Sequence, residues 1–270
     1  MKNISLHVHD DSSMESRLQV ALDITRAHEA HLTCIQPAPF QDYVVGAPMD
    51  GFYTTGALVA ELQDIKAAVR ERIETRLKGE GISWDWVESS VDAASALVTC
   101  TALSDLLIVS QYPGPADADI RPLPIVGEMA VRASCATLVV PAQIHSMEMY
   151  STVVIGWNGS PEAAHALRQA RPFIAHAKRV DIVAVGKDEG EFSQEAASLY
   201  LAHHGIASEL HIIPLTDGSI ANTLHKFAVQ REASVLVIGA YGHSRLREAL
   251  MGGVTRDLLE GSKVSLLLAH

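Results

Sequence analysis

The chain has 270 residues, 48% hydrophobic and 20% charged, which is typical of a globular protein with one large or two ordinary domains. Its formal net charge of −11, without a cluster of lysine or arginine, argues against nucleic acid as a partner. No apolar run is long enough for a membrane span or a signal-peptide core. Three scattered cysteines, Cys34, Cys100 and Cys135, fit reduced thiols, so we expect a soluble, cytoplasmic protein.

Short apolar runs alternate with helical periodicity through the first half. The expected strands are Ile4–Val8, His31–Ile35, Ile82–Glu88, Asp105–Val109 and Thr137–Val140. The expected helices are Met14–Ala30, Ala57–Lys78, Ala93–Leu103 and Val126–Ala133. Prolines and glycines predict a long loop over residues 36–56.

The second half repeats this order of elements. Its expected strands are Thr152–Trp157, Val180–Val185, Ala207–Ile213, Val235–Ile238 and Val264–Leu268. Its expected helices are Pro161–Ala177, Phe192–His204, Ile220–Arg231 and Val254–Glu260. SDLLIVS at 104–110 corresponds to ASVLVIG at 233–239, and HDDS at 9–12 corresponds to WNGS at 157–160. This self-similarity indicates two copies of one fold, with domains 1–145 and 146–270.

Strands that are apolar throughout and alternate with helices predict a parallel sheet covered on both faces. We therefore expect an α/β protein of two tandem doubly wound (Rossmann-like) domains, each with a mainly parallel five-stranded sheet. Ligands of such sheets bind at the carboxyl ends of the strands, near the switch in strand order. The turn Asn158-Gly159-Ser160 and the loop after Gly239 both follow strands, so they are candidates for two walls of one pocket.

Glycines mark the loop after the strand Val235–Ile238. Gly239 is followed by Gly242 and then by the pair Gly252-Gly253, before a helix expected to start near Val254-Thr255. Glycine lets backbone N–H groups approach an anion without an intervening Cβ, and a helix N-terminus adds unpaired donors and a positive dipole end. This pattern is typical of a phosphate-binding loop.

The second half resembles a universal stress protein domain, and the whole chain resembles the tandem members of that family. The resemblance rests on the spacing Gly239-x2-Gly242-x9-Gly252, followed by Gly253, Val254 and Thr255. In the family this loop, G-x2-G-x9-G-S/T, holds the phosphates and ribose of ATP or AMP. The resemblance also implies that the turn at Asn158 lies by the adenosine, and that the backbone around Ala184 and Val185 faces the adenine.

The sequence departs from the family pattern at two positions of this site. Gly253 stands where serine or threonine is usual, which removes a hydroxyl donor worth about 0.5–1.5 kcal/mol. Asn158 replaces an aspartate, which keeps an acceptor but removes a negative charge. In the first half, Ser110 and Pro113 occupy the positions that correspond to Gly239 and Gly242. Proline has no N–H group to donate, so we expect the first half to be a degenerate copy that does not bind nucleotide in the usual way.

The resemblance and the glycine pattern together define the expected nucleotide site. Its residues are Asn158, Gly159, Ser160, Val185, Gly239, Gly242, His243, Gly252, Gly253, Val254 and Thr255. Three of these have alternative interpretations, since Ser160 and Thr255 could cap their helices and His243 could be a solvated loop residue. We assign no group of residues as metal ligands and no residue as catalytic.

Three functions are consistent with this sequence. The first is an adenine-nucleotide-binding protein of stress response or signalling, with ATP or AMP as ligand, with or without Mg²⁺. The second is a decayed nucleotide site with another small or lipid-like ligand, suggested by the aromatic residues of loop 36–56. The third is slow ATP hydrolysis, for which no general base is placed.

The resemblance further implies that the two halves form a pseudo-dimer. Their last strands, Thr137–Val140 and Val264–Leu268, are expected to pair edge to edge, which would cover two otherwise exposed edges. A homodimer has no support in the sequence.

Overall fold

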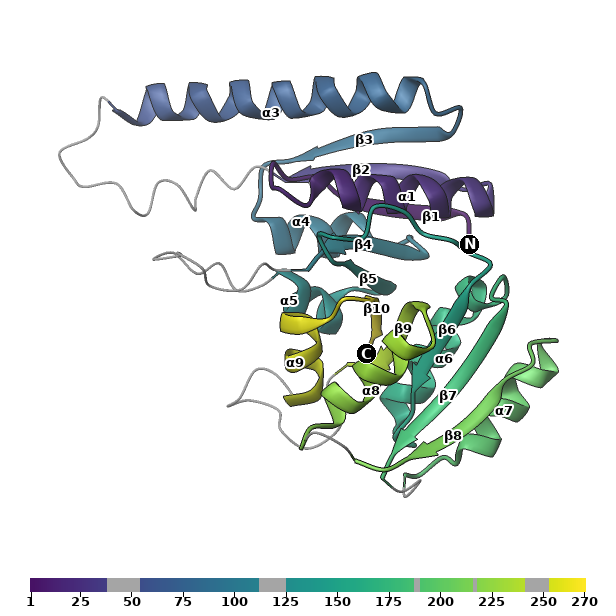
Figure 1. Cartoon of the computed structure of the whole chain (residues 1–270). Coiled ribbons are helices and arrows are strands. Elements are labelled where there is room, and N and C mark those ends of the chain that lie inside the picture. Colours follow the sequence, from purple (N-terminus) through teal and green to yellow (C-terminus); the bar gives the residue numbers. More distant parts are fainter. Residues whose placement is uncertain (38–53, 112–124, 187–189, 216–217, 241–252) are drawn as a thin grey trace.

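Ten strands form one continuous sheet through the molecule (Figure 1). The computed structural model describes residues 1–37, 54–111, 125–186, 190–215, 218–240 and 253–270. The strands of the first half are β1 (Asn3–His7), β2 (His31–Pro37), β3 (Ser83–Ser89), β4 (Leu106–Ser110) and β5 (Ala136–Val140). Those of the second half are β6 (Thr152–Gly156), β7 (Arg179–Val185), β8 (Glu209–Ile213), β9 (Ala233–Gly239) and β10 (Ser265–Ala269).

The strand order is β3-β2-β1-β4-β5-β10-β9-β6-β7-β8. Neighbouring strands are parallel except β5 and β10, which pair antiparallel with Leu138 opposite Leu267. Each half therefore has the doubly wound order, with its switch point between β1 and β4 or between β6 and β9. The predicted fold class and the predicted pairing of the last strands are confirmed.

Helices cover both faces of the sheet. One face carries α1 (Met14–His28), α3 (Thr54–Lys78), α6 (Pro161–Ile174) and α7 (Gln194–His203). The other carries α4 (Ala93–Cys100), α5 (Ile125–Arg132), α8 (Ile220–Gln230) and α9 (Gly253–Gly261). The central strands are buried on both sides, as their uninterrupted apolar sequences require, with Leu106 and Ile108 packed in one core and Leu107 in the other.

Two helices begin at residues other than those predicted. We expected a helix from Phe192, but α7 begins at Gln194 because Ser193 is its N-cap and its Oγ accepts a hydrogen bond from the Ala196 N–H. The helix expected from Ala57 begins three residues earlier, at Thr54. Most of the predicted loop 36–56, with its aromatic residues, lies outside the described residues.

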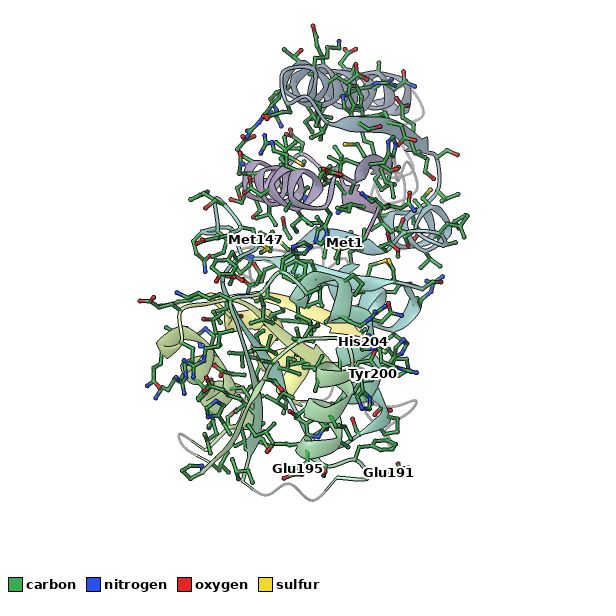
Figure 2. The ribbon with its side chains drawn as sticks, turned by 90° about the vertical axis from the view of Figure 1, so that its right-hand side faces the viewer. Met1, Met147, Glu191, Glu195, Tyr200 and His204 are labelled. Carbon is green, nitrogen blue, oxygen red and sulfur yellow. The ribbon has the colours of Figure 1, made fainter. Side chains whose placement is uncertain are left out.

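The two halves also meet on the α1 face of the sheet, where residues of the connecting segment pack (Figure 2). Met147 is buried there, and its N–H donates to the Asp23 carboxylate at 2.9 Å. Ser16 of α1 donates its hydroxyl to the Ala142 carbonyl at 2.6 Å. These bonds hold the segment between β5 and β6 along α1.

None of the described helices combines the length and apolar character that crossing a membrane requires.

A buried histidine at this junction makes stability depend on pH. The ring of His28 contacts that of His176 edge to face, 4.8 Å between centroids. Burial lowers the pKa of His28 to about 4 from its ordinary value of 6.5, helped by the N-terminal amine, His176 and Lys2. Desolvation here outweighs the helix C-terminus, which would favour the charged ring.

Because the folded-state pKa of His28 is the lower one, the unfolded chain binds more protons between pH 6.5 and about 4. The contribution of His28 to stability is therefore complete at neutral pH and declines as the pH falls through this range. We expect the wild type to lose about 2 kcal/mol more than His28→Gln between pH 7.5 and pH 5. Urea unfolding of both proteins at the two pH values measures this difference, and parallel curves would contradict it.

Candidate functional site

The turn after β6 is fixed by its own hydrogen bonds. Ser160 is the N-cap of α6, and its Oγ accepts the Ala163 N–H at 3.2 Å. Asn158 is exposed, and its Oδ1 accepts the Ser160 N–H at 3.2 Å. Gly159 has a φ of +67°, a conformation that other residues rarely adopt. Ser160 therefore has the capping role that was its alternative interpretation, and the exposed Asn158 amide faces solvent from a rigid turn.

Gly239, the last residue of β9, packs directly on the first turn of α6. A Cβ at this position would lie 2.6 Å from the Ala163 nitrogen and 2.6 Å from the Glu162 carbonyl carbon. These two residues follow the turn at Asn158 without interruption, and β6 and β9 are neighbours in the sheet. The end of β9 thus lies beside the turn at Asn158, and residues 241–252 of the glycine loop lie outside the described residues. The structure also shows that Gly239 is required for strand–helix packing, a reason that its sequence position did not suggest.

The start of α9 lies at the same end of the sheet. This helix precedes β10, which runs parallel to β9, so its N-terminus is placed at the carboxyl end of β9. Gly253 is exposed, and a Cβ there would have no atom of the described residues within 4 Å. Val254 is partly buried, and Thr255 is buried in the first turn. The N–H groups of a helix's first turn have no partner within the helix itself, so this end of α9 is suited to hold an anion.

The end of β7 completes the described part of this region. Val185 is partly buried and pairs with Ile213, and the preceding Ala184 is buried. Gly242, His243 and Gly252 lie outside the described residues. The structure therefore brings the turn at Asn158, the end of β9 and the start of α9 to one end of the sheet, with Val185 at the end of the next strand.

The corresponding strand ends of the first half hold a buried arginine. The Arg17 side chain is 1% exposed, and its Nη2 lies 2.9 Å from Asp11 Oδ2. It also donates to the Ser110 hydroxyl and, at 3.2 Å, to the His9 carbonyl. Burial lowers the pKa of Arg17, and Asp11 opposes this change. In the first half, then, a guanidinium group joins the ends of β1 and β4.

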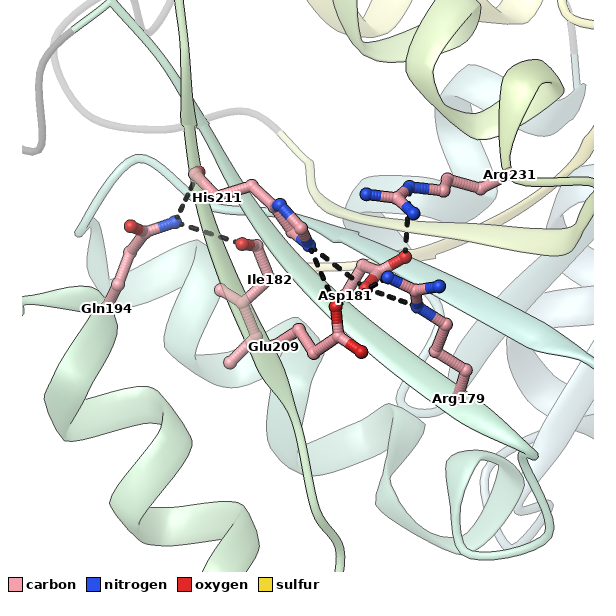
Figure 3. A network of polar contacts seen from close by, with 7 residues as sticks. All are labelled: Arg179, Asp181, Ile182, Gln194, Glu209, His211 and Arg231. Carbon is pink, nitrogen blue, oxygen red and sulfur yellow. Dashed lines mark hydrogen bonds and ion pairs between the residues drawn. The ribbon is translucent and has the colours of Figure 1, made fainter.

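A second polar cluster lies near the amino end of β7 (Figure 3). Asp181 is completely buried, and its Oδ1 lies 2.9 Å from Arg179 Nε and 3.0 Å from His211 Nε2. Arg231 Nε lies 3.7 Å from the other oxygen, and Arg179 also pairs with Glu209 at 2.5 Å. Asp181, Glu209 and His211 offer atoms within 4.8 Å of one another, as metal ligands would. The two arginines neutralise both carboxylates, however, so the geometry favours an ion-pair network between β7, β8 and α8.

Sequence reasoning did not identify Arg17 or Asp181. The only available signal was a single charged residue on an otherwise apolar helix face or strand, as in Val180-Asp181-Ile182. Buried charges of this kind need partners, and these partners come from residues distant in the sequence. Of the three cysteines, Cys34 and Cys135 are buried, whereas Cys100 is partly exposed. Burial raises the pKa of Cys34 to about 12 and that of Cys135 to about 11, so neither forms a reactive thiolate at neutral pH.

Comparison with known proteins places the second half in a family and the whole chain in a fold. Residues 149–270 match the family described as the universal stress protein family. A universal stress protein from Archaeoglobus fulgidus DSM 4304 aligns with 100% of this chain and 98% of its own, at 11% identity and a TM-score of 0.75. A functionally unknown protein from Pseudomonas aeruginosa PAO1 aligns with 99% of this chain and 92% of its own, at 17% identity and a TM-score of 0.59.

Shorter structures align with about half of the chain. One is a universal stress protein solved in complex with cAMP, which covers 46% of this chain and 99% of its own at 23% identity and a TM-score of 0.35. No curated protein matches the sequence at a significant level. Residues 149–270 thus match the universal stress protein family, and the full-length likeness to a universal stress protein shows that the whole chain has a two-part fold of the same kind.

Proposed function

We propose that the second half binds an adenine nucleotide, ATP or AMP, at the carboxyl ends of β6 and β9, and that the chain acts in stress response or signalling. The observation that carries this proposal is the contact between Gly239 and the first turn of α6. It joins the start of the glycine loop to the turn at Asn158, at the end of the sheet where α9 also begins. Strand ends at a switch point are where ligands of this fold class bind.

Each part of the site has a distinct role in this proposal. The N–H groups at the start of α9, from Gly253 to Thr255, bind phosphate. Asn158 and Gly159 lie by the ribose, and the backbone at Val185 faces the base, as in the family. Gly242, His243 and Gly252 are included on their sequence spacing alone. The exposed position of Gly253 fits a phosphate group, because no atom of the described residues lies within 4 Å of the place where its Cβ would be.

The rest of the expected organisation belongs to the same proposal. We infer one nucleotide per chain, since Arg17 occupies the strand ends of the first half. Domains 1–145 and 146–270 are the corresponding units, and the location is cytoplasmic. Mg²⁺ could accompany ATP by binding its phosphate oxygens. Binding, rather than rapid hydrolysis, is the activity that we propose.

Identification of the co-purifying ligand tests this function directly. Protein purified without added nucleotide is denatured, and the released small molecules are analysed by mass spectrometry. We expect the wild-type protein to release ATP or AMP in an amount below one molecule per chain. The variants Gly242→Val and Gly252→Val should release none. A lipid or another small molecule in stoichiometric amount, with no adenine nucleotide, would instead support the decayed-site alternative.

Replacing Gly253 with serine is expected to strengthen nucleotide binding. Among the described residues none blocks the new side chain, and its hydroxyl would restore the donor that the family pattern has at this position. A hydrogen bond of about 0.5–1.5 kcal/mol corresponds to roughly two- to tenfold tighter binding of ATP. Gly253→Ala is the matched control, because it adds the same Cβ without the hydroxyl. Equal affinities of the serine and alanine variants, measured by calorimetry, would show that no phosphate lies at this position.

A further inference from the structure

A short segment after β7 folds back onto the turn that follows β6. The Phe192 N–H donates to the Gly159 carbonyl at 2.9 Å. The Phe192 carbonyl in turn accepts the indole N–H of Trp157 at 2.9 Å. Trp157 is itself buried in the core. Both backbone groups of Phe192 are therefore held by the residues on either side of Asn158.

Two glycines allow the closest approach between these segments. A Cβ on Gly190 would lie 2.7 Å from the Gly159 carbonyl carbon and closer still to the Asn158 carbonyl oxygen. A Cβ on Gly159 would lie 2.7 Å from the Phe192 carbonyl oxygen. Carbon atoms in ordinary contact are about 3.5–4.0 Å apart, so neither side has space for a methyl group. The backbones at Gly159 and Gly190 are in direct contact.

We propose that Gly190 is a positioning residue for the adenosine part of the ligand. This inference rests on the proposed function, in which adenosine lies by the turn at Asn158 and Gly159. The segment from Gly190 to Phe192 lies in the chain between β7 and α7 and packs against this turn, so in this proposal it forms a wall beside the ribose and base. The absence of a side chain at Gly190 keeps this wall against the turn and holds the two in a fixed relative position.

The geometry also separates this role from that of the phosphate loop. Gly190 contacts the turn after β6, whereas the phosphates are expected at the start of α9. Gly190 has a φ outside the positive range that favours glycine, so alanine introduces no backbone strain there. The effect of Gly190→Ala therefore comes from the displaced contact alone. Moving this wall by roughly 1 Å should weaken binding of adenosine but leave the phosphate site intact.

The test compares ATP with inorganic tripolyphosphate by titration calorimetry on the full chain. For Gly190→Ala we expect at least about tenfold weaker ATP binding, with tripolyphosphate affinity within about twofold of wild type. Gly261→Ala is the matched control, since that glycine also lacks a positive φ and has open space around its Cβ, and it should bind both ligands like wild type. A thermal melt of each variant confirms that it is folded.

Trp157→Phe provides a second variant that does not alter a glycine. It keeps an aromatic ring but removes the hydrogen bond to Phe192. We expect a smaller loss of ATP affinity, about threefold, and unchanged affinity for tripolyphosphate. If Gly190→Ala and Trp157→Phe bind ATP as tightly as wild type, or lose both ligands equally, the positioning role is wrong. Wild-type protein that binds no adenine nucleotide at all would instead refute the proposed function itself.

Discussion

Replacing Arg17 with alanine is expected to lower the free energy of unfolding by about 3 kcal/mol. The guanidinium is almost fully buried, and its partners are the Asp11 carboxylate, the Ser110 hydroxyl and the His9 carbonyl. Removing it takes a charged donor from all three groups, although Asp11 still accepts the Ser13 N–H and the His9 carbonyl the Asp11 N–H, and it leaves a cavity where the side chain packed. The lower end of the range for broken buried ion pairs applies, because Asp11 is about one-third exposed at 32%.

A surface arginine on the same helix provides the control. Arg26 is 41% exposed and pairs with Asp23 and Glu80. Exposed pairs contribute little, so Arg26→Ala should cost less than about 1 kcal/mol. Both variants are compared with wild type by urea unfolding at pH 7.5. Equal destabilisation by the two substitutions would mean that Arg17 does not join the ends of β1 and β4 as the structure describes.

Replacing Gly239 with alanine is expected to weaken ATP binding by about 100-fold or more and to destabilise the protein by about 1–3 kcal/mol. The new methyl group would lie 2.6 Å from backbone atoms of Glu162 and Ala163, which cannot rotate away as a side chain can. The end of β9 and the first turn of α6 must therefore separate. That movement displaces the glycine loop relative to the turn at Asn158, and a small displacement of binding groups has a large effect on affinity.

Gly253, another glycine of the proposed site, serves as the comparison for this variant. No atom in the described parts of the chain lies within 4 Å of a Cβ at Gly253, so Gly253→Ala should fold normally and bind ATP within a few-fold of wild type. Calorimetry and thermal unfolding of both alanine variants distinguish the two environments. The packing explanation fails if Gly239→Ala has wild-type stability and affinity, or if Gly253→Ala loses as much of both.

The fold could be predicted from the sequence because its signals are local and repeated. Runs such as Val235–Ile238 indicate buried parallel strands, and glycine or serine next to a helical pattern indicates where a helix begins or ends. The correspondence of 104–110 with 233–239 then implies that the second half repeats the first. The pairing of β5 with β10 came from family resemblance, since apolar strands of similar length do not by themselves specify their neighbours.

The site was predictable in outline but not in its contacts. The glycine spacing identifies the loop, yet it does not show that Gly239 is needed for packing on α6. The contact between Gly159 and Gly190 joins positions whose proximity depends on how β6 and β7 pair. Arg17 and Asp181 are similar, because their partners become neighbours only in the folded chain. Local sequence carries propensity, whereas such close approaches depend on tertiary packing.

The central claim is that the second half of this chain, which matches the universal stress protein family, binds an adenine nucleotide. Titration calorimetry of the full chain with ATP and with AMP, after removal of any co-purified ligand, tests it most directly. The account predicts saturable binding of at least one of these nucleotides with one site per chain, because Arg17 lies at the ends of β1 and β4, where a second site would be in the first half. If neither ATP nor AMP binds, the account is contradicted.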